Sequence, residues 1–116
     1  MDETRLQKVA RLIQRDMSEI LQQEATALFE GAMITVTRAR VSADLSVARL
    51  YVSIFALRGK TPEDIFKLLE EKRTFLRMKL AQRVKNQLRV IPEISFFLDD
   101  SLDYIENIDN LLKDKK

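Results

Sequence analysis

The sequence predicts a two-layer α+β domain in which helices cover one face of a three-stranded sheet. Three observations support this prediction. Apolar residues recur at helical spacing near the N-terminus, two β-branched runs follow, and a third such run comes after a long amphipathic stretch. The expected order is helix, strand, strand, helix, helix, strand, helix. The length of 116 residues fits a single domain over residues 1–116 with one modest core, and residues 113–116 are expected to fray.

The first helix is expected to begin after Thr4. Thr4 is a good N-cap, and Gln7 stands where a capping box requires it. The helix is expected to run to about Glu24 or Phe29, and Gly31 marks its end. Its apolar stripe comprises Leu6, Val9, Ile13, Met17 and Ile20.

Two strands joined by a short turn are expected next, over residues 32–42 and 46–55. In the second strand, Ala48, Leu50, Val52 and Ile54 share one face. In the first strand, Ile34 and Val36 are out of phase with Ala39 and Val41. A bulge near residues 37–39 would bring both pairs to the core side of the sheet.

A second helical region is expected from Thr61, a cap that precedes a proline. One apolar stripe comprises Ile65, Leu68 and Leu69, and the other comprises Leu76, Leu80, Val84 and Leu88. These stripes belong either to two helices that meet near residues 72–75 or to one bent helix. A third strand over residues 89–98, with Pro92 indicating an edge or a strand start, and a last helix carrying residues 102–112 complete the chain.

The composition argues against most enzyme classes. The chain has no cysteine and no histidine, so it lacks disulfides, thiolate nucleophiles, the commonest general base and the commonest metal ligand. No acid is paired with a base or nucleophile, and we therefore expect no enzyme, no cofactor and no small-molecule substrate. Asp99, Asp100 and Asp103 are interpreted as acids at a helix start rather than as a metal site. No signal or membrane-spanning segment is visible, and we expect a cytoplasmic protein.

Charge is strongly segregated, although the net charge is only +2. Residues 72–89 carry seven basic residues and no acid, residues 4–15 carry four and no acid, and residues 90–112 carry six acids and no base. One positive face, suited to RNA phosphates, is therefore expected, although a solvated helix face is the alternative. The candidate RNA-binding residues are Arg5, Lys8, Arg11, Lys72, Arg73, Arg77, Lys79, Arg83, Lys85 and Arg89.

The predicted strands carry further candidates. Arg38, Arg40 and Arg49 either line an open sheet face that binds RNA or are ordinary outward residues, and the second interpretation is slightly favoured. Tyr51, Phe55, Phe96 and Phe97 either stack on bases or pack in the core, and strand alternation favours core packing for at least two of them.

Three stretches together resemble the ribosome-binding factor A family: residues 11–21, 41–53 and 88–101. The resemblance implies a KH-like fold of type II with a mixed sheet. It also implies that the protein binds the immature small (30S) ribosomal subunit and its 16S rRNA, and that it assists late maturation and processing of the rRNA 5′ end. No catalysis is implied, and a monomer is expected off the ribosome. The rival interpretation is a protein-interaction module that uses the sheet face or the acidic C-terminal helix.

One departure from related folds is visible in the sequence. Typical KH domains clamp the nucleic-acid backbone with a GxxG loop between the middle helices. The two glycines of this chain are Gly31 and Gly59, so it has no such loop. The ribosome-binding factor A family replaces this loop with a small-residue kink, alanine-x-glycine, and the matching positions here are Lys72, Arg73 and Thr74, so that kink is missing as well.

Overall fold

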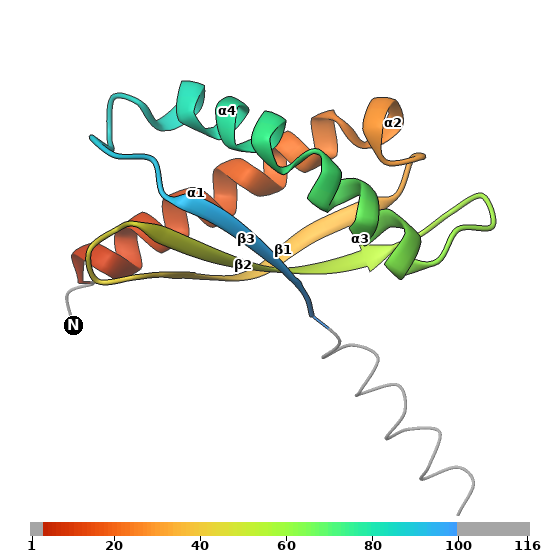
Figure 1. Cartoon of the computed structure of the whole chain (residues 1–116), viewed down its shortest axis with the longest axis horizontal. Coiled ribbons are helices and arrows are strands. Elements are labelled where there is room, and N and C mark those ends of the chain that lie inside the picture. Colours follow the sequence, from red (N-terminus) through yellow and green to blue (C-terminus); the bar gives the residue numbers. More distant parts are fainter. Residues whose placement is uncertain (1–3, 100–116) are drawn as a thin grey trace, which may run out of the picture.

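The computed structural model describes residues 4–99, and the predicted C-terminal helix and tail lie outside this range. The elements in chain order are α1 (Arg5–Gln23), α2 (Ala25–Leu28), β1 (Met33–Val41), β2 (Val47–Phe55), α3 (Pro62–Glu71), α4 (Arg73–Val84) and β3 (Glu93–Leu98). Figure 1 shows their arrangement, with the helices lying on one side of the sheet. The predicted order is confirmed over the described residues.

The sheet is mixed and has the strand order β1-β2-β3. Strand β1 pairs antiparallel with β2, and β2 pairs in parallel with β3. The α3–α4 region therefore forms the crossover between the two parallel strands, which require such a connection. No element of residues 4–99 covers the second face of the sheet, which we call the open sheet face.

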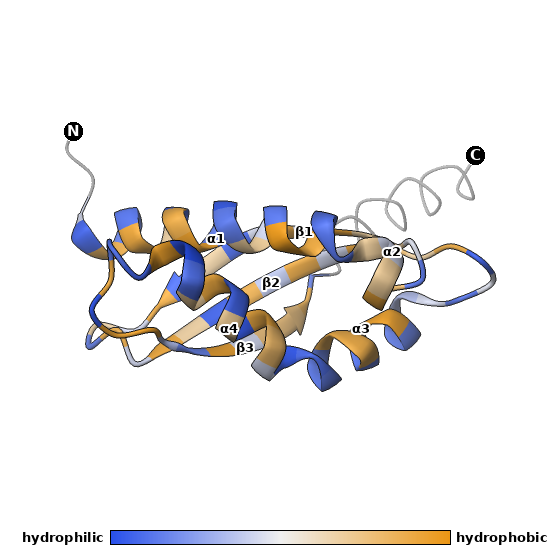
Figure 2. Cartoon of the chain, turned by 90° about the horizontal axis from the view of Figure 1, so that it is seen from above, coloured by the Kyte–Doolittle hydropathy of each residue, from blue (hydrophilic) through white to orange (hydrophobic). Residues whose placement is uncertain are grey.

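The first helix begins where the sequence predicts. The Thr4 hydroxyl accepts a hydrogen bond from the Gln7 amide, and the Gln7 side chain accepts one from the Thr4 amide. The chain then passes through the single turn of α2 to Gly31, whose φ of +75° is one that glycine adopts without strain. Figure 2 shows hydrophilic and hydrophobic residues alternating along α1, as an amphipathic helix requires.

The predicted bulge in the first strand is confirmed. The register between β1 and β2 shifts between Val36 and Arg38, which leaves Thr37 as the extra residue. Ile34 and Val36 are buried before the bulge, and Ala39 and Val41 pack against the core after it.

The second helical region consists of two helices, one of the two predicted alternatives. Thr61 and Asp64 form a capping box at the start of α3, and the hydrogen bonds from Thr61 lower the pKa of the Asp64 carboxyl. Lys72 separates α3 from α4, with φ −96° and ψ 10°. The GxxG loop is thus replaced by a direct helix-to-helix junction.

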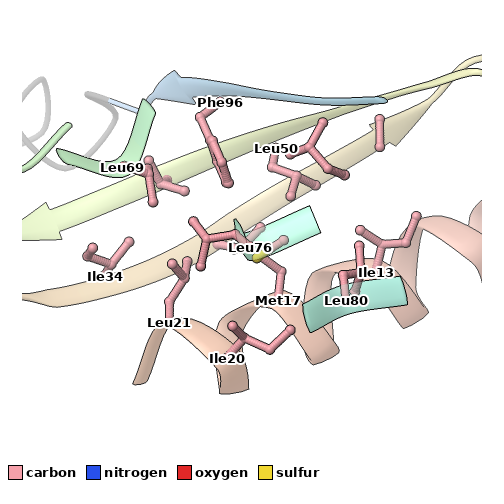
Figure 3. Packing of buried hydrophobic residues seen from close by; sticks show 14 of the residues in the cluster. Ile13, Met17, Ile20, Leu21, Ile34, Leu50, Leu69, Leu76, Leu80 and Phe96 are labelled. Carbon is pink, nitrogen blue, oxygen red and sulfur yellow. The ribbon is translucent and has the colours of Figure 1, made fainter. Parts of the chain in front are cut away.

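The core lies between the helices and the covered face of the sheet. Figure 3 shows Ile13, Met17 and Leu21 of α1 and Leu76 and Leu80 of α4 converging with Ile34, Leu50 and Phe96 of the three strands. These side chains are buried, and truncating one of the leucines to alanine typically costs about 2–5 kcal/mol. The core therefore holds both layers together.

The third strand is shorter than predicted. It begins at Glu93 rather than at residue 89, because Pro92 has no backbone N–H to donate to a ladder. In addition, the carbonyls of Ile91 and Pro92 accept hydrogen bonds from the Arg77 side chain instead of from a neighbouring strand. Strand pairing starts only at the next residue, where the Glu93 amide donates to the Ser46 carbonyl at 2.8 Å.

Candidate nucleic-acid interface

The ten candidate RNA-binding residues do not share one environment. Arg77, half-buried on α4, uses its guanidinium for hydrogen bonds within the protein. Its Nε lies 2.9 Å from the Pro92 carbonyl oxygen, and its Nη2 lies 2.7 Å from that of Ile91. These two bonds tie α4 to the segment that leads into β3. The guanidinium therefore stabilises the fold, and its predicted RNA contact stays a prediction.

Arg83 also binds within the protein, through ion pairs with two acids of α1. Its Nη1 donates to the Glu19 carboxylate and lies 3.5 Å from Oδ1 of Asp16. The hydrogen bond to Glu19 raises the pKa of Arg83 further above its ordinary value. Asp16 is buried at 7% exposure and also contacts Arg15 at 3.6 Å. This ion-pair network joins the middle of α1 to the end of α4.

Three further candidates lie along the earlier part of α4. Lys72 is half-buried at the junction with α3, and Arg73 is exposed in the first turn. The Lys79 ammonium lies 5.5 Å from the centre of the Phe75 ring, in a cation–π contact. None of the three forms an ion pair with an acid of residues 4–99.

The chain leaves α4 through a turn that sets the positions of the last two candidates. The amides of Gln87 and Leu88 both donate to the Val84 carbonyl, at 2.8 and 2.9 Å. Leu88 is thereby directed into the core at 7% exposure, while Lys85 and Arg89 stay exposed on either side of it. The alternation of apolar and basic residues in the sequence thus becomes an inside–outside arrangement.

The start of α1 lies against this turn. Arg5 and Lys8 of α1 line a hollow of about 240 Å³ together with Gln87 and Leu88. Arg5 and Lys8 line this hollow, while Lys85 and Arg89 flank Gln87 and Leu88 in the chain, and we call these four basic residues the helix-end cluster. All four are exposed, and none has an ion-pair partner among residues 4–99. Arg11, also exposed, lies one turn farther along α1.

The hairpin tip between β1 and β2 closes the other side of this region, because Arg5 also lines a hollow with Ala43, Asp44 and Leu45. Asp44 Oδ1 accepts hydrogen bonds from the hydroxyls of Ser42 and Ser46, at 2.8 and 2.7 Å. These bonds, together with one from the Ser46 amide, lower the pKa of Asp44 to about 2. Asp44 thus builds the turn, which an aspartate does without any further role.

The prediction that at least two of the four strand aromatics pack in the core was wrong, because Phe96 is the one of them that is buried. Phe55 and Phe97 are 66% and 41% exposed, and Tyr51 is half-buried on the open sheet face. Strand alternation directs Phe96 into the core and its neighbour Phe97 onto the open sheet face, which no element of residues 4–99 covers. Arg38, Arg40 and Arg49 are exposed on the strands.

Among residues 4–99, no group of acids, cysteines or histidines is arranged to hold a metal ion. Within the same range, no helix is both long and apolar enough to cross a membrane. The sequence groups Asp99, Asp100 and Asp103 as acids at a helix start, and two of these, Asp100 and Asp103, lie outside the described residues.

The comparison with family models decides the classification. The model described as ribosome-binding factor A matches residues 5–112 of the chain. The chain belongs to the ribosome-binding factor A family. The match spans the layer of helices and all three strands described above, so the resemblance seen in three stretches of sequence extends over nearly the whole chain.

Relatives named ribosome-binding factor A support this membership. The one from Christiangramia forsetii is 40% identical over 118 residues, covering 100% of this chain and 88% of the relative. The one from Cytophaga hutchinsonii is 43% identical over 112 residues, covering 97% of this chain and 83% of the relative.

Solved structures of ribosome-binding factor A share the fold. The crystal structure of the protein from Thermus thermophilus has a TM-score of 0.67 at 24% identity and covers 82% of this chain and 97% of its own. A homology model of the Thermus thermophilus protein, fitted into the cryo-EM map of its complex with the 30S subunit, has a TM-score of 0.61 at 28% identity and covers 78% of this chain and 91% of its own. The predicted KH-like fold is confirmed.

Proposed function

We propose that this member of the ribosome-binding factor A family binds the immature small ribosomal subunit and its 16S rRNA through the helix-end cluster. The observation that carries the proposal is that Arg5 and Lys8 line one hollow with Gln87 and Leu88 of the turn after α4, whose neighbours in the chain, Lys85 and Arg89, are exposed. None of the four basic residues has an ion-pair partner among residues 4–99. The cryo-EM map into which the homology model of the Thermus thermophilus relative was fitted is that of a complex with the 30S subunit, which supports the proposed partner.

The physical basis is the exchange of counterions at the RNA backbone. Guanidinium and ammonium groups that contact phosphates release condensed cations, so binding weakens steeply as salt rises. Phosphate contacts of this kind give affinity and orientation, and they carry no sequence information directly. Selectivity for the subunit therefore comes from the shape of folded rRNA and from how many phosphates the cluster can meet at once.

The cluster also explains how the domain can bind RNA without a GxxG loop. The junction between α3 and α4 holds Lys72 and Arg73, whose side chains exclude the close backbone approach that glycines permit. The cations at the opposite end of α4 supply the charge instead. Secondary RNA contacts are made by Lys72, Arg73 and Lys79 along α4. Arg11 adds a further contact on α1.

In this proposal the protein acts by binding and not by catalysis. A ligand shifts a conformational equilibrium only by its difference in affinity for the two states. Tighter binding to the immature subunit would therefore hold the rRNA in a form that assists late maturation, including processing of the 16S rRNA 5′ end. The protein would work in the cytoplasm and be a monomer off the ribosome.

The first experiment is co-sedimentation with purified immature and mature 30S subunits. The test variant carries Lys8→Glu and Lys85→Glu, and the control carries Lys60→Glu and Lys67→Glu. The control residues are also exposed, but they lie by the start of α3, at the other end of the molecule in Figure 1. Both variants change the net charge equally, so non-specific electrostatics alone affects both alike.

We expect the test variant to weaken binding to immature subunits roughly tenfold or more, and the control to weaken it much less. Equal recovery of the two variants would overturn the assignment of the helix-end cluster. The processing role is tested separately, by primer extension of 16S rRNA in cells depleted of the protein. Unchanged 5′ ends there would contradict that part of the proposal.

A further inference from the structure

The open sheet face carries a row of three stacked side chains. Arg38 of β1, Tyr51 of β2 and Phe97 of β3 lie opposite one another in register. The guanidinium carbon of Arg38 lies 4.4 Å from the centre of the Tyr51 ring, and the Tyr51 and Phe97 ring centres are 5.3 Å apart at an interplanar angle of 26°. The three groups form a continuous stack across the sheet.

One aromatic ring face at the end of the stack, the outer face of Phe97, has no stacking partner among residues 4–99. Arg38 and Phe97 reach Tyr51 from the strands on its two sides, so both faces of the Tyr51 ring are occupied. Phe97 is on the edge strand β3, has Tyr51 on one side only and is 41% exposed. A further flat group can therefore extend the stack on the outer face of Phe97.

A pair of arginines lies in the next row of the same face. Arg40 and Arg49 are directly opposite each other, and both are exposed. With Val41, Ser42 and Val47 they line a hollow of about 300 Å³. Neither has an ion pair within residues 4–99, and like charges placed directly opposite across strands repel. An anion held between them would relieve that repulsion.

We propose that the open sheet face binds an unpaired RNA nucleotide, with its base stacked on Phe97 and its phosphate held by Arg49 and Arg40. Arg49 pairs with Ser95, two residues before Phe97, which separates the two subsites by about 7 Å along the strand. Arg49 also lies one strand spacing, about 5 Å, from β3 across the sheet, so its long side chain has to reach toward β3 to hold the phosphate of the same nucleotide. The inference rests on the proposed function, because it adds a second contact to the same RNA.

The arrangement selects unpaired RNA over a duplex. Both faces of a base inside a helix are covered by its neighbours, whereas an unstacked base exposes a face to an aromatic side chain. Stacking on a phenylalanine tolerates any base, so little sequence preference is expected. The nearby acids lie at the ends of this surface: Glu93 is one row beyond Arg49, and the Asp99 carboxylate accepts a hydrogen bond from Thr37.

Binding of the full-length protein to a labelled oligouridylate of about ten nucleotides tests this inference, with a blunt-ended RNA duplex as the second probe. Phe97→Ala is expected to raise the Kd for the oligouridylate about tenfold and to leave that for the duplex unchanged. Phe55→Ala is the matched control, because Phe55 is 66% exposed on the same face but lies opposite Met33, away from the arginines. This control is expected to bind like the wild type.

A second readout reports the contact directly. An oligouridylate carrying 5-iodouridine is expected to cross-link under ultraviolet light to the peptide that contains Phe97. Arg49→Gln is expected to weaken binding, with partial rescue by Arg49→Lys. Thermal unfolding of each variant checks the fold, which these exposed side chains affect little.

Two results would overturn the inference. One is an equal effect of Phe97→Ala and Phe55→Ala, and the other is cross-linking confined to α1 and the turn after α4. If either occurs while 30S recovery still depends on Lys8 and Lys85, the sheet-face inference fails and the proposed function stands. If wild-type protein does not recover 30S subunits at all, both fail together.

Discussion

The basic stretch of residues 72–89 divides into two regions that use the same kinds of side chain for different purposes. Within α4, Arg77 binds backbone carbonyls and Arg83 binds carboxylates of α1. After α4, Lys85 and Arg89 are exposed and have no ion pair among residues 4–99. A run of cations in a sequence is therefore not equivalent to a binding surface, because some of its members hold the fold together.

The comparison predicts that substitutions of Arg77 and Arg83, which hold other parts of the protein, change stability, and that those of Lys85 and Arg89 change affinity. The largest effect is expected for Arg77→Met, which keeps the length of the stem but removes both hydrogen bonds to the carbonyls of Ile91 and Pro92. We expect a loss of about 2–3 kcal/mol in the free energy of unfolding, measured by urea denaturation. Arg73→Met, exposed one turn earlier, is the control and is expected to stay within about 0.5 kcal/mol.

A smaller loss of stability is expected for Arg83→Gln. The substitution removes the link to Glu19 and leaves the buried Asp16 with Arg15 as its remaining cation. We expect a cost of about 1–2 kcal/mol, because Arg83 is partly exposed to solvent. A double-mutant cycle with Glu19→Gln checks the pairing: additive effects of the two substitutions would show that the ion pair contributes nothing.

The second region should behave in the opposite way. Lys85→Ala combined with Arg89→Ala is expected to change the free energy of unfolding by less than about 0.5 kcal/mol, because neither side chain is buried. The affinity for immature 30S subunits should fall roughly tenfold, since two phosphate contacts are lost. A stability loss as large as that of Arg77→Met would erase the distinction between the two regions.

The smallest effect is expected at Asp44, beside the helix-end cluster. Its carboxylate is stabilised in the folded hairpin, where hydrogen bonds from Ser46 and Ser42 lower its pKa from 3.8 to about 2. Its contribution to stability is therefore complete above about pH 4 and is lost as the pH falls toward 2. Urea unfolding of wild type and Asp44→Asn should show a difference that is constant above pH 4 and narrows below it. A difference that grows on acidification would contradict this interpretation.

Local features of the fold were predictable because they depend on neighbours in sequence. The capping box at Thr4 follows from residues three positions apart, the cap at Thr61 follows from the proline after it, and the bulge at Thr37 follows from a phase change within one strand. The junction near Lys72 was left open between two helices and one, because no glycine or proline marks it.

The site was less predictable because its composition depends on contacts between distant residues. Arg83 meets acids more than 60 positions earlier in the chain, and nothing in the local pattern of α4 distinguishes it from Lys85. The stack of Tyr51 on Phe97 similarly requires β3 to pair in parallel with β2. The periodicity of the sequence identified the strands but not the order in which they pair, so it could not show which aromatic side chains would contact one another.

The most direct test is the salt dependence of binding to immature 30S subunits. The logarithm of the affinity is measured against the logarithm of salt concentration for wild type, for Lys8→Ala with Lys85→Ala, and for Lys60→Ala with Lys67→Ala. The helix-end pair should lower the steepness of the slope by about 1 per lysine, and the control pair should leave it unchanged. Identical slopes for all three proteins would contradict the claim that the helix-end cluster meets the RNA backbone.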